Sequence, residues 1–207
     1  MDQKQYWNDV AENKEFTTPF NLDAFSRYVR PQAAVLEIGC GYGRVLEELR
    51  RNGYPHLTGI DFSERMIGRG RELFPHLDLR TENVSDFADR SFDAVLLVAV
   101  LTCIVGDEEQ LSLLGEIKRI LRPGGVLYIN DFLLNQDTRN LERYEAFKDR
   151  HGIYGVFELP EGALLRHHDS AWVEKSLEPF QALHLEKVVY TTMNGNQSNG
   201  YRYLGRK

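Results

Sequence analysis

The stretch VLEIGCGYGRVL, residues 35–46, decides the fold of this chain. Its first four residues are mostly apolar and predict a short buried strand, and the apolar side chains after Gly43 predict the start of a helix. Three glycines lie in the turn between the two. Glycine permits positive φ and lets the backbone approach a ligand closely, while the first turn of a helix presents unpaired N–H groups. The stretch therefore predicts a ligand-binding turn at the end of a strand.

The spacing of the glycines narrows the choice of ligand. A dinucleotide fingerprint reads G-x-G-x-x-G/A, but here the sixth position is Arg44. The glycines instead read G-x-G-x-G, at Gly39, Gly41 and Gly43, with Glu37 two residues before the first. This pattern resembles motif I of the class I S-adenosylmethionine-dependent methyltransferases.

A second strand and helix fit the same resemblance. Residues 57–61 are a short apolar run that ends in Asp61, and residues 62–67 open a helix with Ser63 as a suitable N-cap and Met66 as its third residue. An acid at a strand end about 20 residues after a glycine loop binds the hydroxyl groups of a ribose. Both S-adenosylmethionine and NAD carry a ribose, so this acid alone does not discriminate between them.

Three later segments complete a series of five motifs. Residues 82–87, 91–97 and 121–129 are similar to the adenine-contact segment of the family, its fourth strand and the L-[KR]-P-G-G turn before its fifth. Each motif alone is weak evidence. All five occur in the family's order between residues 33 and 131, which is strong evidence for the cofactor and the fold but says little about the substrate.

Strands and helices alternate along the centre of the chain, which predicts βαβ units. The resemblance implies an α/β, Rossmann-like class I methyltransferase fold: a mostly parallel seven-stranded sheet with helices on both faces and a C-terminal antiparallel hairpin. The expected strands are residues 33–38, 57–61, 77–81, 92–98, 125–131, 183–193 and 201–205, with a polar turn over 194–200. The expected helices are residues 43–52, 63–73, 107–121, 137–150 and 169–178.

We expect residues 1–207 to form a single methyltransferase domain. Its parts are an N-terminal helical cap over 1–30, a cofactor-binding core over 31–134, a lid insertion over 135–168, and a C-terminal helix and hairpin over 169–207. Pro19 is suited to start the second helix of the cap. The large side chains of the cap and the insertion are expected to close over the carboxyl ends of the strands; they are Tyr6, Trp7, Phe16, Tyr154 and Phe157.

Composition excludes several classes of protein. The two cysteines are too few for a disulfide scaffold, and no apolar run is long enough to span a bilayer or to mark a secretory signal, so a cytoplasmic protein without a membrane partner is expected. The net charge of −6 disfavours nucleic acid as a partner. The basic cluster at Arg65, Arg69 and Arg71 is interpreted as a solvated helix face. A monomer or a homodimer fits equally well.

The resemblance assigns cofactor roles residue by residue. It implies that Glu37 orders the glycine loop and the methionine end of the cofactor, that Asp61 binds the ribose, and that Asn83 accepts from the adenine amino group. Leu97 and Val98 would line the methionine side. The full implied set is Glu37, Gly39, Cys40, Gly41, Gly43, Asp61, Phe62, Met66, Asn83, Val84, Leu97 and Val98.

Methyl transfer from a sulfonium needs alignment and a dry site more than it needs acid–base groups. A base is required only when the acceptor atom starts protonated. His167 and His168 form the one polar cluster suited to that role, although neighbouring residues on a strand point to opposite faces, so at most one should face the site. An exposed strand end before a helix cap is the alternative interpretation. No spacing of ligands suggests a metal site.

Two functions from different classes remain open. The first is transfer of the methyl group of S-adenosylmethionine, leaving S-adenosylhomocysteine, to a small and mostly apolar or aromatic molecule. The second is a protein of the same fold that binds these ligands without transferring methyl, as a regulatory module or with other cofactor chemistry. An NAD(P)-dependent oxidoreductase is a third possibility. The identity of the acceptor and of the methylated atom does not follow from the sequence.

Overall fold

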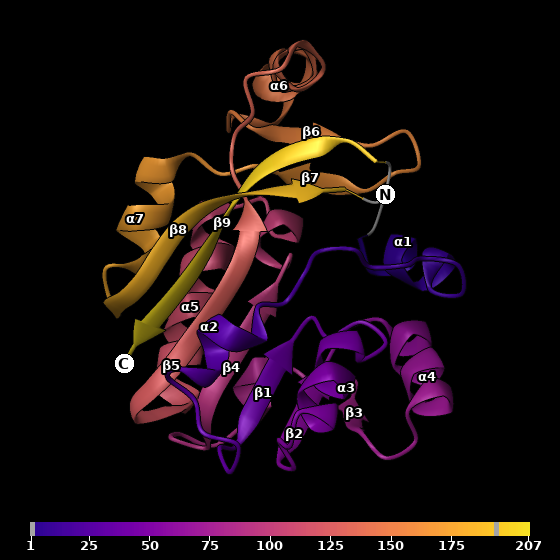
Figure 1. The fold of residues 1–207 in the computed structure, drawn as a ribbon. Coiled ribbons are helices and arrows are strands. Elements are labelled where there is room, and N and C mark those ends of the chain that lie inside the picture. The colour runs from indigo at the N-terminus through magenta and orange to yellow at the C-terminus, as the bar shows by residue number, and fades with distance from the viewer. Residues whose placement is uncertain (1–2, 193–194) are drawn as a thin grey trace.

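The computed structural model describes residues 3–192 and 195–207. The chain alternates between strands and helices through its central part, and ends in a long hairpin (Figure 1). The helices are α1 (Gln3–Val10), α2 (Leu22–Ser26), α3 (Arg44–Arg51), α4 (Glu64–Leu73), α5 (Asp107–Ile120), α6 (Thr138–His151) and α7 (Ser170–Leu177). The strands are β1 (Val35–Ile38), β2 (Leu57–Ile60), β3 (Asp78–Arg80), β4 (Phe92–Val98), β5 (Leu121–Phe132), β6 (Val156–Glu158), β7 (Leu164–Arg166), β8 (Gln181–Thr191) and β9 (Gln197–Arg206). Two short 3₁₀ turns are η1 (Val84–Asp86) and η2 (Leu101–Cys103).

The main sheet confirms the expected fold class. Its seven strands run in the order β3-β2-β1-β4-β5-β9-β8, and the first five are parallel. Strand β9 lies between β5 and β8 and is antiparallel to both. The C-terminal hairpin therefore extends the parallel sheet with one strand of reversed direction, as the resemblance implied.

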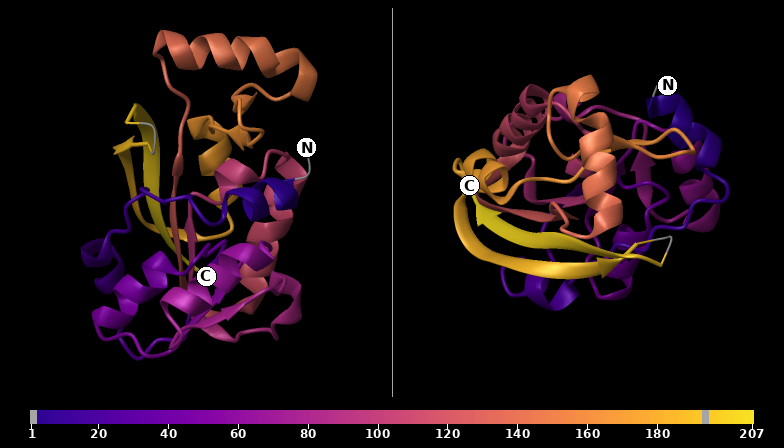
Figure 2. Two further views of the ribbon diagram at one scale, coloured as in Figure 1. Left: turned by 90° about the vertical axis from the view of Figure 1, so that its right-hand side faces the viewer. Right: turned by 90° about the horizontal axis from the view of Figure 1, so that it is seen from above.

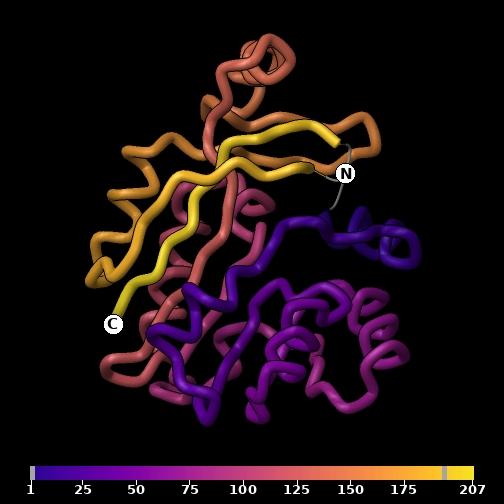
Figure 3. Tube along the Cα trace, in the orientation of Figure 1, coloured from indigo at the N-terminus to yellow at the C-terminus, as the bar shows by residue number. Residues whose placement is uncertain are grey.

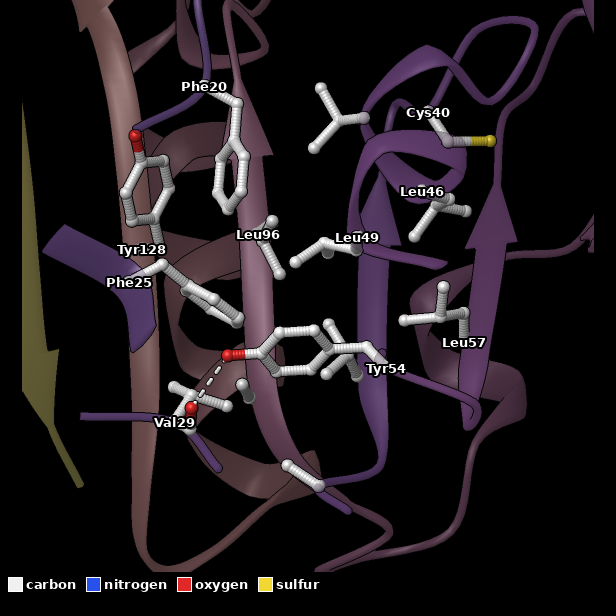
Figure 4. Close-up of a cluster of buried hydrophobic side chains, with 14 of the residues drawn as sticks. Phe20, Phe25, Val29, Cys40, Leu46, Leu49, Tyr54, Leu57, Leu96 and Tyr128 are labelled. Carbon is white, nitrogen blue, oxygen red and sulfur yellow. Dashed lines mark hydrogen bonds between the residues drawn. The ribbon is translucent and has the colours of Figure 1, made fainter. Parts of the chain in front are cut away.

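Alternating side chains of the strands build a core on each face of the sheet. Ala94 and Leu96 of β4 pack with α2 and α3 on one face, whereas Val95 and Leu97 pack with α5 and α7 on the other. Strand β4 is buried on both faces, as its apolar sequence predicts. Figure 4 shows the first of these clusters, in which the hydroxyl of Tyr54 donates to the carbonyl oxygen of Val29 (2.8 Å).

Two segments outside the parallel core lie at the carboxyl ends of its strands. Helix α6 and the small antiparallel pair β6–β7 follow β5 and lie beyond the end of the sheet, as Figure 1 and the left view of Figure 2 show. The N-terminal segment passes from α1 to α2 across the molecule (Figure 3). It is fastened by Asn130, whose amide donates to the carbonyl oxygen of Pro19, and by Thr17, whose hydroxyl donates to the carbonyl oxygen of Thr191.

Several element boundaries differ from the sequence-based expectation. Strand β5 starts at Leu121 instead of 125, because Leu121 pairs with Phe92 before the Pro-Gly-Gly turn. Strand β9 starts at Gln197, inside the stretch expected to be a turn, because it pairs with β8 along its whole length. Helix α2 starts after Asn21, whose side chain accepts from the N–H of Ala24 (2.8 Å), and not at Pro19. The expected strand end and turn start at residues 193 and 194 lie outside the described residues.

The interpretation of the basic cluster as a solvated helix face holds for Arg65 and Arg71, which are exposed, but is wrong for the half-buried Arg69. Arg69 donates to the carbonyl oxygens of Ala11 (3.0 Å) and Lys14 (2.7 Å), and Arg71 donates to the carbonyl oxygen of Leu79 (2.8 Å). These guanidinium groups fasten neighbouring backbone segments to α4. The sequence pattern missed them because the partners are carbonyl groups, which carry no sequence signal.

Candidate active site

A cavity of about 210 Å³ lies at the carboxyl ends of the parallel strands, between the N-terminal segment and the segment that follows β5. Ligands of open α/β sheets bind at this edge. Its walls come from four sources: the glycine loop, the ends of β2 and β4, the N-terminal segment and residues 135–168, which were expected to form a lid. Its lining includes Glu37, Gly39, Cys40, Asp61, Phe62, Met66, Val98 and His167 from the set expected in the sequence.

Glu37 brings an unpaired carboxylate oxygen to this cavity. Its side chain is 3% exposed, and Oε2 has no hydrogen-bond partner. Burial raises the pKa of Glu37 to about 8, with the nearby Arg44 opposing the shift. A buried carboxylate without a partner is costly. An ammonium group placed beside Oε2 would supply the missing donor, which is the chemistry of the methionine end of S-adenosylmethionine.

Asp61, which directly follows β2, fixes the glycine loop through a hydrogen bond. Gly41 has φ of +55°, and its N–H donates to Oδ2 of Asp61 (2.9 Å). The other carboxylate oxygen of Asp61 accepts from the N–H of Ser63 (2.8 Å). Burial raises the pKa of Asp61 from its ordinary value, and these two N–H donors oppose the shift. Each carboxylate oxygen can accept a further hydrogen bond, so Asp61 is suited to a pair of ribose hydroxyls.

The start of α4 confirms the expected cap. Ser63 is the N-cap, and its Oγ accepts from the N–H of Met66 (3.2 Å). Phe62 lines the cavity with 44% of its surface exposed, whereas Met66 is buried. A free aromatic face beside Asp61 suits the base of a nucleoside.

Five residues of the expected cofactor set do not line the cavity. Gly41 and Gly43 act through the backbone of the loop, since Gly43 is the left-handed N-cap of α3. Leu97 packs into the core on the α5 face. Asn83 and Val84 lie at η1, where the N–H of Asn83 donates to Oδ2 of Asp86 (2.9 Å). The adenine contact assigned to Asn83 and Val84 stays a prediction.

The N-terminal segment supplies an aromatic wall. Trp7 and Phe16 line the cavity, and Phe16 stacks on Tyr42 with ring centres 5.4 Å apart. The guanidinium of Arg69 lies over the ring of Tyr42, with Cζ 4.1 Å from the ring centre, and donates to two backbone carbonyls of the same segment. Tyr6 is buried but does not line the cavity. Two of the three expected N-terminal aromatic residues therefore reach the site.

The segment after β5 supplies the opposite wall. Phe157 lines the cavity together with Arg139 and Arg143, which lie one helical turn apart on α6. Tyr154 is 47% exposed and packs on Tyr144 instead of lining the cavity. Sequence reasoning missed both arginines; their i, i+4 spacing was the one available signal, and it is equally typical of a solvated helix face.

The two histidines have different surroundings. His167 lines the cavity, and its Nδ1 lies 2.5 Å from the hydroxyl of Tyr144. His168 does not line it: Nε2 contacts the amide of Gln110 (2.9 Å), and Nδ1 contacts the carbonyl oxygen of Phe132 (3.0 Å). Burial lowers the pKa of His168 to about 4. The hydrogen bonds of His168 give no support for a base there, and the role of His167 stays a prediction.

Cys103 also lines the cavity, and burial raises the pKa of its thiol. A protonated thiol is a poor nucleophile, which agrees with a packing role for Cys103. Among residues 3–192 and 195–207, no group of three His, Cys, Asp or Glu residues is arranged to hold a metal ion. In the same part of the chain, no helix has the length and apolar character needed to cross a membrane.

Comparisons of the sequence and of the fold with known proteins both find methyltransferases. Residues 36–129 match the family model described as "Methyltransferase domain". A solved SAM-dependent methyltransferase of Methanosarcina mazei superposes with a TM-score of 0.85 at 24% identity, over 91% of this chain and 99% of that chain. At this identity the superposition establishes the fold.

Curated relatives share only part of their length with this chain. It is 32% identical over 148 residues to a carboxy-S-adenosyl-L-methionine synthase of Actinobacillus succinogenes, covering 65% of this chain and 61% of that protein. It is 31% identical over 115 residues to a Mus musculus eEF1A lysine and N-terminal methyltransferase, covering 50% of this chain and 16% of that protein. The first of these names gives carboxy-S-adenosyl-L-methionine as the compound made, and the second gives a protein as the methylated molecule.

Proposed function

We propose that this chain transfers the methyl group of S-adenosylmethionine to a small-molecule acceptor, because residues 36–129 match the methyltransferase family model and the chain has the fold of a SAM-dependent methyltransferase. The observation that carries the proposal is the pairing of two acids, the buried Glu37 and the half-buried Asp61, at neighbouring strand ends. Glu37 keeps an unpaired oxygen at the cavity, and Asp61 holds the glycine loop open while keeping acceptor capacity for a ribose.

The cofactor would occupy the side of the cavity formed by the glycine loop and β2. There, Oε2 of Glu37 would accept from the methionine ammonium group, directly or through water, and Asp61 would accept from the ribose hydroxyls. Gly39, Cys40, Phe62, Met66 and Val98 are the other expected cofactor residues that line this cavity. When bound, the cofactor supplies a methyl group on an activated sulfonium leaving group.

The protein's own contribution would be alignment and exclusion of water. Trp7 and Phe16 close one side of the cavity and Phe157 the other, so an acceptor between these walls would approach with little surrounding solvent. This enclosure supports a small molecule over a polymer. The net charge of −6 also disfavours a nucleic acid as acceptor.

Turnover is the test of this function. Purified protein is incubated with S-adenosylmethionine and pools of small metabolites, and formation of S-adenosylhomocysteine is followed with the methylated product identified by mass spectrometry. We expect product from at least one pool. Methylation of tRNA or of a protein, with no product from any pool, would contradict the small-molecule assignment.

The second candidate is a protein that binds the cofactor without transferring methyl, and the similarity to a carboxy-S-adenosyl-L-methionine synthase favours it as the alternative. The same experiment separates the two. Tight binding of S-adenosylhomocysteine without product from any small molecule, protein or tRNA would support the alternative. Conversion of the cofactor itself into a new compound would do so as well.

We also propose that residues 1–207 act as one domain in the cytoplasm, as a monomer or a homodimer. The two cysteines are both free thiols, which agrees with a reducing compartment. The N-terminal segment and the lid insertion face one cavity, which agrees with a single functional unit.

A further inference from the structure

A buried hydrogen-bond network fixes how His167 meets the cavity. The N–H of Asn199 donates to Oδ1 of Asn135 (2.7 Å), and a backbone N–H can only donate. The amide nitrogen of Asn135 therefore lies on the other side, where it donates to the carbonyl oxygen of Leu133 (3.0 Å) and lies 3.1 Å from both Oγ of Ser198 and Nδ1 of His167. The orientation of the Asn135 amide is thus set by the backbone of the C-terminal hairpin.

The hydroxyl of Tyr144 also contacts Nδ1 of His167. The hydroxyl oxygen accepts from the N–H of Asn135 (3.3 Å), which directs its proton toward Nδ1 of His167 (2.5 Å). The amide nitrogen of Asn135 cannot accept a hydrogen bond, so an unprotonated Nδ1 fits both of its neighbours, the Tyr144 hydroxyl and the Asn135 amide. A neutral imidazole with an unprotonated Nδ1 carries its proton on Nε2. Burial and the charge of Arg143 also lower the pKa of His167 well below its ordinary value.

The free nitrogen of His167 is consequently a donor and not a base. No hydrogen bond among residues 3–192 and 195–207 uses Nε2 of His167, and the side chain lines the cavity. The imidazole is held between aromatic rings, with Phe132 stacked at 5.6 Å and Phe157 edge-on at 4.9 Å. It therefore presents one oriented N–H group to whatever occupies this end of the cavity.

Arg143 presents a positive charge to the same place. Its guanidinium lies 3.6 Å from the centre of the Phe157 ring, which orients the planar group and leaves its edges free. No ion pair between described residues involves Arg143, and its buried Nε has no hydrogen-bond partner. Burial lowers the pKa of Arg143, and the like charge of Arg139 acts in the same direction, whereas Tyr144 and Asp137 oppose the shift.

The acids that line the cavity lie on one of its sides only, where Arg44 also lies. The acids that line it, Glu37 and Asp61, lie at the glycine loop and the end of β2. Arg139 and Arg143 lie on α6, which Figure 1 shows at the opposite end of the molecule from α3 and β2. Arg139 has one weak ion pair, with Asp137 at 3.7 Å. The lid side of the cavity therefore has donors and positive charge without a matching acid.

Building on the proposed function, we propose that the acceptor carries a carboxylate, which the Arg143 guanidinium and the Nε2–H of His167 bind at the lid side of the cavity. Arg139 adds positive charge at the entrance. The planar guanidinium matches the two oxygens of a carboxylate, and Phe132, Phe157 and Leu165 provide apolar surface for the rest of the acceptor. The two side chains select and orient the acceptor without exchanging a proton with it.

Binding to matched pairs of ligands tests this assignment. The full chain is saturated with S-adenosylhomocysteine, and the dissociation constants of aliphatic and aromatic carboxylic acids are compared with those of their primary amides by calorimetry or ligand-observed NMR. Phenyl phosphate is included beside benzoate. We expect at least one acid to bind tenfold or more tightly than its amide. Equal binding of all pairs, no binding of any acid, or a preference for the phosphate would overturn the proposal.

Variants of α6 test whether Arg143 causes the preference for the carboxylic acid over its amide. Arg143→Gln should remove the preference for the acid, and Arg143→Lys should retain part of it. Arg150→Gln is the matched control: Arg150 lies on the same helix, is paired with Glu158 (2.9 Å) and does not line the cavity. Affinity for S-adenosylhomocysteine should stay within twofold in all three variants. A loss of that affinity in Arg143→Gln would overturn the proposal, because the arginine would then bind the carboxylate of the cofactor.

The position of the proton on the His167 ring can be measured separately by NMR. Long-range ¹H–¹⁵N correlation spectra distinguish the two neutral tautomers and the imidazolium, and sequential assignment identifies His167. We expect the neutral Nε2–H tautomer at pH 7. A signal of the Nδ1–H tautomer or of the imidazolium would overturn the donor assignment. Failure of the wild type to bind S-adenosylhomocysteine would contradict the proposed function instead, so the two failures are distinguishable.

Discussion

The N–H of Gly41 donates to Oδ2 of Asp61 across 2.9 Å, and this bond joins the loop after β1 to the end of β2. The two strands are neighbours in the sheet, with Glu37 opposite Gly59. One carboxylate thus shapes the glycine loop and faces the cavity at the same time. The conformation of the loop and its ligand chemistry depend on the same side chain.

Replacing Asp61 by alanine should lower affinity for S-adenosylhomocysteine at least tenfold. Hydrogen bonds to a charged group are worth about 1.5–3 kcal/mol each, and about 1.4 kcal/mol corresponds to a factor of ten. Isothermal titration calorimetry measures the change. Asp89→Ala is the control, since Asp89 is an exposed acid whose partner is Arg119 (2.8 Å). Equal affinities of the two variants would contradict the role of Asp61.

Gly41→Ala should weaken cofactor binding as well as the fold. An alanine at φ of +55° costs about 1–2 kcal/mol, and its Cβ would lie 2.5 Å from Cε2 of Phe16. The aromatic wall would then have to move. Gly53→Ala is the control, because Gly53 has φ of +86° with no atom near the added Cβ. Chemical denaturation and titration should show a loss of stability in both variants, but weaker binding in Gly41→Ala alone.

Glu37→Gln should change how stability depends on pH. The pKa of Glu37 is about 8 in the folded chain against an ordinary value of 4.5. Between these values the folded state binds more protons than the unfolded state, so the stability of the unliganded wild type falls as pH rises. In Glu37→Gln, residue 37 does not titrate, so this fall in stability with rising pH is absent. The melting temperature of this variant relative to wild type should rise from pH 5 to pH 8.5, and its affinity for S-adenosylhomocysteine should fall.

Differential scanning calorimetry across that range is the measurement for Glu37, with the exposed Glu72→Gln as the control. A melting-temperature difference that does not vary with pH would show that Glu37 is ionised in the unliganded fold. The unpaired oxygen would then have a partner that the account omits.

Arg69→Ala should loosen the N-terminal segment. Arg69 donates to two backbone carbonyls of that segment, whereas the neighbouring Arg65 is exposed and contacts Asp9 only at 3.8 Å. Limited proteolysis should cleave within residues 3–18 faster in Arg69→Ala than in wild type, and Arg65→Ala should behave like wild type. Since Trp7 and Phe16 lie in this segment, affinity for S-adenosylhomocysteine should fall only in Arg69→Ala. Identical cleavage rates in Arg69→Ala and wild type would contradict the role of Arg69 in holding the N-terminal segment in place.

The parts of this molecule that follow from local pattern were predictable. Buried strands such as β4 have continuous apolar sequences, and the cap at Ser63 depends on a residue type at one position. The family motifs place Glu37 and Asp61 at strand ends, and both line the cavity. The start of β9 was not predictable, because pairing with β8 outweighs the polar, glycine-containing sequence around it.

The lid side of the site depends on contacts between distant segments. Arg143 is distinguished from an ordinary surface arginine by the Phe157 ring beneath it and by having no ion pair with any described residue. The proton position on His167 depends on Asn199, which lies 32 residues further along the chain. Neither relationship leaves a mark in the local sequence, so the sequence could suggest a histidine near the site but not its role.

Calorimetric titration of the wild-type chain with S-adenosylmethionine, S-adenosylhomocysteine and NAD tests the central claim most directly. The arrangement of Glu37, the glycine loop and Asp61 leads us to expect micromolar to millimolar binding of the first two ligands and none of NAD. Asp61→Ala should weaken the binding of both. Binding of NAD, or no binding of either S-adenosyl compound by the folded wild type, would contradict the assignment of this cavity as the cofactor site.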